Sequence, residues 1–278
     1  DVYKRQVDKM HSFLIGLYLY LRREFLELVT YKLSLMLGVV SAVVGIVQFA
    51  FLAVFLQQGN SFPSLQNYGG SVMAFLVSGA LFTGFMSSSL SSFSQLISSE
   101  QRTGTLEAVL TTPFSIGRVI AYAAVSSFIQ LVIGTFLMIT FFGIAFSIPF
   151  NVNPWQLILV MILGYFTLVG LGLAGGGVLL VTKKGDPVTW LLTTFTTLFS
   201  GVLYPVEILP QWLQSISWYV PTTRILSSLR GALTGYTSMF MLDVVYLIVA
   251  SIVSMSIGLL VFRWGLNRAI WDGSATSY

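Results

Sequence analysis

Long apolar segments, separated by short polar ones, divide the chain. No Asp, Glu, Lys, Arg or His occurs between Lys32 and Glu100, or between Arg118 and Lys183, and each gap exceeds sixty residues. A helix needs only about 20 residues to cross the hydrocarbon core of a bilayer. Each gap is therefore predicted to be a hairpin of two crossings, broken by the polar, proline-containing segments 57–63 and 147–153.

Two more apolar segments follow, so the predicted fold is an all-α membrane protein with six transmembrane helices. Asn153 and Asp186 each precede a proline, and this pair is typical of a helix start. We expect those residues to begin the fourth and fifth crossings. The six predicted crossings are 33–57, 71–97, 119–146, 155–181, 187–204 and 242–264.

The segment before the first crossing has a helical apolar stripe. Its members are Leu14, Leu17, Leu21, Phe25 and Leu28. Spacings of three and four residues predict an amphipathic helix over 12–31, lying on the membrane surface. The alternative is a plain extension of the first crossing. Residues 1–6 resemble a translated sequencing adapter, so we exclude them from the fold prediction.

The stretch 205–235 is too interrupted by proline to form a crossing. The pattern predicts two short helices: one after Pro210, with Trp212 and Trp218 as interfacial anchors, and one capped by Thr222 or Thr223 that ends near Gly235. We expect both helices to re-enter the outer leaflet. The alternative is an external loop with a surface helix.

Composition excludes several classes of function. Only 9% of the residues are charged and 55% are hydrophobic, which excludes a soluble enzyme or a disordered chain. The net charge of +4 is too small for a basic nucleic-acid-binding face. The chain has no Cys and one His, so it offers no disulfide and no Cys or His metal cluster.

The distribution of basic residues predicts the orientation. With the N-terminus inside, the cytoplasmic side holds twelve basic residues and the outside only Arg224 and Arg230. Cytoplasmic loops carry an excess of Lys and Arg. Both termini are therefore expected in the cytoplasm.

Hydroxyl side chains form regular stripes in two of the crossings. Such stripes indicate helix packing or the lining of a substrate path, and the two interpretations are compatible. The stripe of the second crossing is Ser87, Ser91, Ser94 and Ser98, and that of the fifth is Thr189, Thr193, Thr196 and Ser200. A group of glycines at 164–177 predicts close helix packing in the fourth crossing.

The chain shows no energy source of its own. The first four crossings contain no Asp, Glu, Lys, Arg or His, whereas ion-coupled transporters usually need an ionisable group within the membrane. No glycine-rich nucleotide motif is present, and His11, the single histidine, lies outside the crossings, so no intramembrane nucleophile–base pair is expected. We predict no catalytic, cofactor-binding or metal-binding residue in this chain.

The predicted cytoplasmic loop 98–118 has the pattern of a short helix with one apolar side. A docking helix for another protein is favoured, and a solvated turn is the alternative. The residues expected to make the contact are Glu100, Arg102, Gly104, Thr105, Leu106, Glu107 and Pro113.

This Glu-x-x-x-Gly-Thr-Leu-Glu-x-x-x-x-x-Pro pattern, between the second and third of six crossings, resembles the membrane subunit of type-2 ATP-binding-cassette (ABC) exporters. The segment 201–231 is similar to a second signature of that family. Its marker residues are Pro205, Pro210, Trp212, Pro221 and Arg230.

The resemblance implies an ABC ATPase subunit that binds ATP and Mg²⁺, a coupling helix at about 100–113 and a second permease copy. It also implies a path near the first, second and fifth crossings, in the plasma membrane of a prokaryote. A hydrophobic or amphipathic substrate is then expected to move outward. The alternative function is an ATP-independent secondary transporter or channel.

Overall fold

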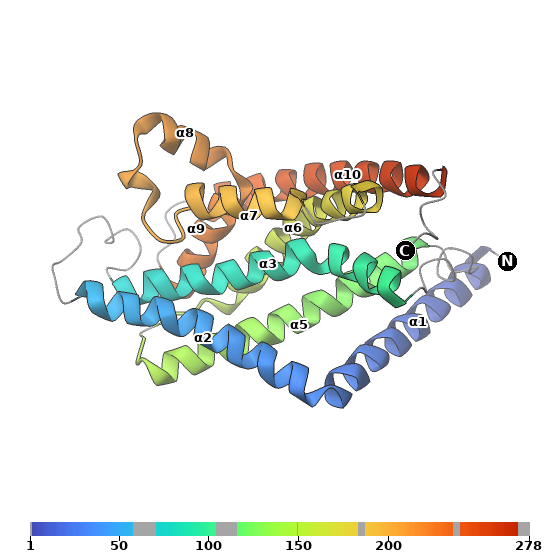
Figure 1. The fold of residues 1–278 in the computed structure, drawn as a ribbon, viewed down its shortest axis with the longest axis horizontal. Coiled ribbons are helices and arrows are strands. Elements are labelled where there is room, and N and C mark those ends of the chain that lie inside the picture. Colours follow the sequence, from blue (N-terminus) through green and yellow to red (C-terminus); the bar gives the residue numbers. More distant parts are fainter. Residues whose placement is uncertain are drawn as a thin grey trace.

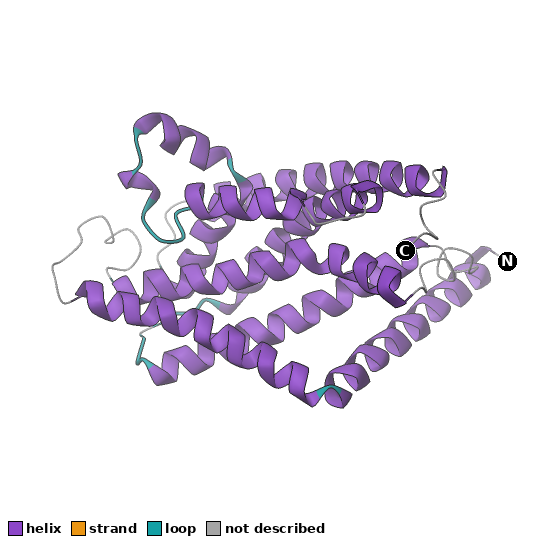
Figure 2. Ribbon diagram, in the orientation of Figure 1, coloured by secondary structure: helices purple, strands orange, loops and turns teal. Residues whose placement is uncertain are grey.

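The structure, a computed structural model, describes residues 2–57, 71–103, 116–148, 150–182, 187–235 and 240–271. These segments are helical apart from short turns (Figure 2). The elements are α1 (Val2–Thr30), α2 (Lys32–Gln57), α3 (Val72–Thr103), α5 (Ile116–Ala145), α6 (Pro154–Thr182), α7 (Pro187–Phe199), the 3-10 helix η2 (Val206–Ile208), α8 (Gln211–Tyr219), α9 (Pro221–Thr234) and α10 (Phe240–Trp271).

Among the described residues, five helices are long and apolar enough to cross a membrane, and they correspond to five of the six predicted crossings. They lie along the long axis of the molecule, and the start of α1 and the end of α10 lie at the same end of it (Figure 1). Asn153 begins the fourth crossing as predicted: its side chain accepts a hydrogen bond from the Gln156 amide. The candidate spans are Leu35–Leu56, Val72–Gln95, Gly117–Ala145, Pro154–Thr182 and Phe240–Ala269.

The fifth predicted crossing is shorter than expected. Helix α7 has 13 residues, or about 20 Å at 1.5 Å per residue, against roughly 30 Å for a hydrocarbon core. The predicted end at residue 204 is wrong, because Gly201 adopts a left-handed φ of 74° directly after the last helical turn. Glycine takes this conformation without a steric cost and commonly ends a helix.

Glycines bring α6 and α10 into close contact at the centre of the bundle. Gly170 and Gly177 of α6 meet Gly258 and Gly265 of α10, backbone against backbone, and a Cβ at Gly177 would lie only 2.7 Å from α10. Gly172 faces the backbone of α3 in the same way. The close packing predicted from this glycine group is confirmed, and it makes α6 the central helix of the bundle.

The first helix is separate from the first crossing. The chain leaves the helical conformation at Tyr31 and bends sharply there, so that α1 runs obliquely beside α5 (Figure 1). A continuous extension of α2 therefore does not fit. The packed face of α1 is also offset from the predicted stripe, because Leu14 and Phe25 are exposed while Phe13 and Tyr20 contact a ring of α5.

The two external helices form as predicted, but their start and surroundings differ. Helix α9 begins at Pro221 after Val220, with no side-chain cap, so the predicted caps Thr222 and Thr223 lie inside the helix. Gly235 ends it in the left-handed conformation, as expected. Most of α9 is buried between α3, α6 and α10, which does not fit a helix lying on the surface.

Candidate functional site

The serine stripe of α3 is buried at one end and exposed at the other. Ser94 is buried, Ser91 is half-buried and Ser87 is exposed, while the side chain of Ser98 lies outside the described residues. The Ser91 hydroxyl donates to the Ser87 carbonyl (2.7 Å) and accepts from Gln95 Nε2 (3.0 Å). Helix α3, the most deeply buried candidate span, therefore has one uncharged polar face that other helices do not cover.

The hydroxyl stripe of α7 divides in a similar way. Thr189 and Thr193 are half-buried, whereas Thr196 and Ser200 are buried. Both buried hydroxyls lie beside Thr222 of α9, at 3.3 Å and 2.6 Å. The last turn of α7 therefore packs against α9, and only the earlier part of the stripe is open. Helices α3 and α7 are in contact.

Arg230, in the external signature, is a buried structural residue. Its guanidinium donates to the Ser78 hydroxyl (3.2 Å) and to the carbonyls of Phe75 (3.2 Å), Gly201 (2.9 Å) and Val202 (3.1 Å). It also lies 3.6 Å from the centre of the Phe75 ring. Arg230 thus ties α9 to α3 and to the turn that ends α7.

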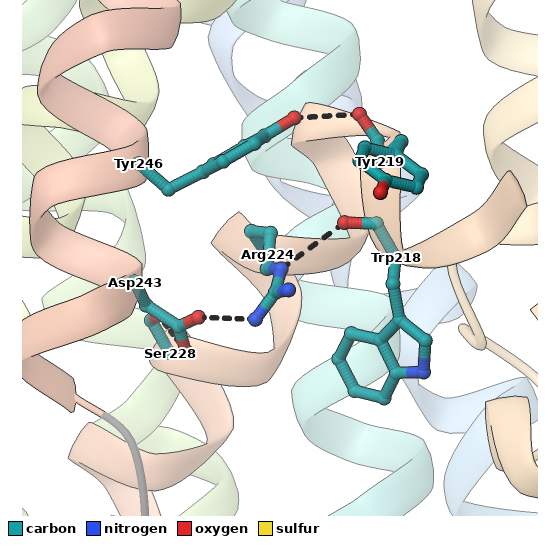
Figure 3. Close-up of polar contacts among 6 residues, drawn as sticks. All are labelled: Trp218, Tyr219, Arg224, Ser228, Asp243 and Tyr246. Atoms are coloured by element: carbon teal, nitrogen blue, oxygen red, sulfur yellow. Dashed lines mark hydrogen bonds and ion pairs between the residues drawn. The ribbon is translucent and has the colours of Figure 1, made fainter. Parts of the chain in front are cut away.

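Arg224, the second cation of this part of the chain, is held between α8, α9 and α10 (Figure 3). Its guanidinium forms an ion pair with Asp243 at 2.8 Å and donates to the Trp218 carbonyl at 3.1 Å. The Ser228 hydroxyl donates to the second oxygen of Asp243 at 3.1 Å. Asp243 is only 6% exposed, and a buried carboxylate needs such partners because water no longer solvates it.

The same group of side chains binds the carboxyl end of α8. The last carbonyls of a helix lack partners within the helix and carry partial negative charge. The Tyr246 hydroxyl donates to the Tyr219 carbonyl, while Arg224 donates to that of Trp218 (Figure 3). Exposed helix α8 is therefore fixed to α9 and α10 at its end.

The prolines of the external signature each mark a helix start. Pro205 immediately precedes η2, Pro210 immediately precedes α8, and Pro221 is the first residue of α9. Proline fits these positions because its fixed φ suits a helix start and its missing N–H is not needed there. Trp212 is 65% exposed on α8, as an interfacial anchor requires.

The predicted coupling segment is only partly described. Helix α3 continues to Thr103 and α5 begins at Ile116, so both ends of the predicted segment 98–118 are helical. Glu100 and Arg102 belong to the last turn of α3 because the helix extends beyond the apolar span. Five residues of the coupling prediction lie outside the described residues: Gly104, Thr105, Leu106, Glu107 and Pro113.

Glu24 of α1 places a carboxylate beside α5. The sequence pattern did not predict this contact. The carboxylate is half-buried on the packed face of α1, near Gln130 and Tyr20. Burial raises the pKa of Glu24, and the nearby charge of Glu27 raises it further. The sequence feature that could have predicted this contact is an acidic residue, Glu24, within the predicted amphipathic helix.

Sequence reasoning also missed the network around Arg224. Asp243 is the first acidic residue after Arg224, and Arg230 is the only other charge between them, which made the ion pair one of two possible pairings. The contributions of Ser228 and Tyr246 depend on the crossing of α9 and α10, which no local pattern specifies.

A family model agrees with this arrangement over most of the chain. The model for the ABC-2 type transporter matches residues 16–234, from α1 to the end of α9. None of the curated proteins matches the chain. The matched region contains both predicted signatures and four of the five candidate spans, so the chain belongs to the ABC-2 type transporter family and is a permease subunit of type-2 ABC transporters.

Proposed function

We propose that this chain moves a hydrophobic or amphipathic substrate outward across the plasma membrane of a prokaryote. The energy comes from a separate ABC ATPase, which binds ATP and Mg²⁺. The observation that carries the proposal is the family match over residues 16–234. Family membership implies association with such an ATPase, and the apolar character of the candidate spans supports a path for an apolar substrate.

The proposed transport unit contains two permease copies, with the path between them. The open hydroxyl faces of α3 and α7, at Ser87, Ser91 and Thr193, would border that path. Hydroxyls suit this position because they can bond back to their own helix when no substrate is present, as Ser91 and Thr193 do. Helices α2 and α7 also expose large apolar side chains, which suits a contact with a second copy.

Six crossings and two cytoplasmic termini remain part of the proposal. Helix α6 ends near the same end of the molecule as α10, whereas α10 begins at the other end (Figure 1). The chain must therefore return between them, and α7 carries most of that return. With its flanking turns, α7 would complete the fifth crossing, and re-entrant α9 would lead into the sixth.

The proposed coupling uses motion of whole helices. ATP binding closes the two ATPase subunits, and the coupling segment at about 100–113 transmits that movement to α3 and α5. The permeases then rock between inward-facing and outward-facing states. The close contact of α6 with α10, together with the tie between α3 and α9 through Arg230, supports movement as a packed body.

Variants of the coupling segment test the proposal. We expect Gly104→Trp and Glu107→Lys to leave the permease folded and inserted, but to weaken co-purification of its ABC ATPase partner. Glu107→Ala should be mild, since an exposed ion pair contributes only about 0–1 kcal/mol. Unchanged docking in both strong variants would reject this segment as the coupling element.

A further inference from the structure

The seam between α1 and α5 is polar and aromatic. Tyr20 and Glu24 come from α1, one helical turn apart, and Tyr122, Ser126 and Gln130 repeat every four residues on α5. The rings of Tyr20 and Tyr122 are 6.1 Å apart, and Gln130 Nε2 donates to the Ser126 hydroxyl at 3.3 Å. Glu24 contacts Tyr20 and Gln130 in this seam.

The carboxylate lies beside the middle of a candidate span. Gln130 is twelve residues after Arg118, which is the only charged residue of α5, and this corresponds to about 18 Å along the helix. Arg23 and Glu27 on the same helix are exposed, whereas Glu24 is turned toward α5 and half-buried. A glutamine or leucine would fill the position without the cost of desolvating a charge.

A second group in the seam also lacks a structural explanation. Tyr122 is 5% exposed, and its hydroxyl has no hydrogen-bond partner among the described residues. The hydroxyl lies against Gly16, where a Cβ would be 2.5 Å away. Buried hydroxyls almost always find a partner, so this one remains able to bond to a molecule that enters the seam.

We propose that Tyr20, Glu24 and Gln130, with Tyr122 beside them, bind the cationic group of an amphipathic substrate that enters from the surrounding lipid. The assignment of this ligand as the transported substrate rests on the proposed function. A carboxylate attracts a cation directly, and the faces of tyrosine rings add a further attraction. Gln130 and its neighbour Ile129 are exposed, so the seam opens at the side of the bundle.

The charges around Glu24 leave room for such a ligand. On its own helix, Arg23 and Glu27 are exposed and act in opposite directions on the pKa of Glu24. The helices packed against α1 are α5 and α2, whose charged residues are Arg118 and Lys32. Lys32 is eight residues beyond Glu24, and Arg118 is twelve residues before Gln130.

Binding of a permanently charged lipophilic cation tests the site. The full-length chain is placed in lipid nanodiscs without nucleotide, and the Kd of tetraphenylphosphonium is measured beside that of tetraphenylborate, an anion of similar shape. We expect Glu24→Gln to raise the Kd of the cation by about tenfold or more. The attraction between one pair of opposite charges, at an effective dielectric constant near 20, exceeds the free energy that corresponds to a tenfold change in Kd. Binding of the anion should not weaken.

Glu27→Gln is the matched control, because it removes the same charge from the exposed side of the same helix. We expect it to change the Kd by less than about twofold. Equal affinity of the wild type and Glu24→Gln overturns the proposal, as does an equal loss in both variants. Because the probe does not titrate, its binding to the wild type should decline as pH falls through the raised pKa of Glu24, and Glu24→Gln should show no such decline.

This binding assay is separate from the test of ATP coupling. A chain that binds the cation through Glu24 but never associates with an ATPase would contradict the proposed function and leave the site standing. A chain that couples to its ATPase but binds the cation equally well without Glu24 would contradict the site alone.

Discussion

At the residue scale, the two arginines predicted to lie outside are parts of the fold rather than loop charges. Arg224 is paired with Asp243, and Arg230 is buried among carbonyl groups of α3 and of the turn after α7. In the predicted topology, these two arginines are the basic residues that do not lie on the cytoplasmic side. The positive-inside rule concerns charges in loops, so these structural arginines do not weaken the predicted orientation.

Replacing Arg230 should destabilise the protein strongly. Arg230→Ala removes the donor from Ser78 and from three backbone carbonyls, and we expect a loss of about 3 kcal/mol or more. The check is thermal unfolding of the purified permease in detergent. Arg263→Ala, at an exposed position of α10, is the control and should have little effect. Equal thermal stability of the two variants would contradict the role of Arg230.

The sequence predicted the local backbone roles of residues better than it predicted their interaction partners. The helix after Pro210, its partner helix ending at Gly235 and the close packing of the α6 glycines were predicted correctly, because these properties depend on the backbone of the residues themselves. Two partners of Arg230, Ser78 and Phe75, lie more than 150 residues away in α3, and no local pattern identifies them. Thr222 was predicted as a cap, but its hydroxyl bonds to α7 instead.

At the element scale, the length of each apolar segment predicted that a helix exists there. It did not predict the residue at which the helix ends. The predicted loop after the second crossing began at residue 98, but α3 continues to Thr103. A helix does not stop where the apolar residues stop, because its backbone bonds remain favourable outside a membrane. At α7 the opposite occurs, and Gly201 ends the helix before the apolar residues end.

The seam between α6 and α10 should not tolerate a larger side chain. Gly170→Leu would place a Cβ in contact with the backbone of α10 at Ser254 and Met255, and backbone cannot move aside as a side chain can. We expect a loss of about 1–3 kcal/mol, as for other overpacked cores. The measurement is again the unfolding temperature in detergent.

Gly134→Leu on α5 is the matched control for this seam. Nothing lies within 4 Å of a Cβ at Gly134, and leucine has a higher helix propensity than glycine. This variant should be as stable as the wild type or slightly more stable. Similar losses at Gly134 and Gly170 would show that the close contact of α6 with α10 is not what holds the bundle.

At the scale of the whole molecule, the orientation in the membrane is the largest prediction that the fold itself leaves open. The chain contains no Cys, so single cysteines can report accessibility. Cysteines at Asn60, Asn151 and Ser238 should react with an impermeant thiol reagent from outside the cell, and those at Gln101 and Gly185 should not. The reverse pattern would place both termini outside.

The central claim is that the permease works only with an ATPase that acts through the segment at about 100–113. The most direct measurement is uptake of a lipophilic substrate into inside-out vesicles that contain the permease and its ATPase. We expect uptake with hydrolysable ATP, none with a non-hydrolysable analogue, and a loss in Gly104→Trp although the permease is inserted at a normal level. Uptake that persists without ATP, or at full rate in Gly104→Trp, would contradict the account.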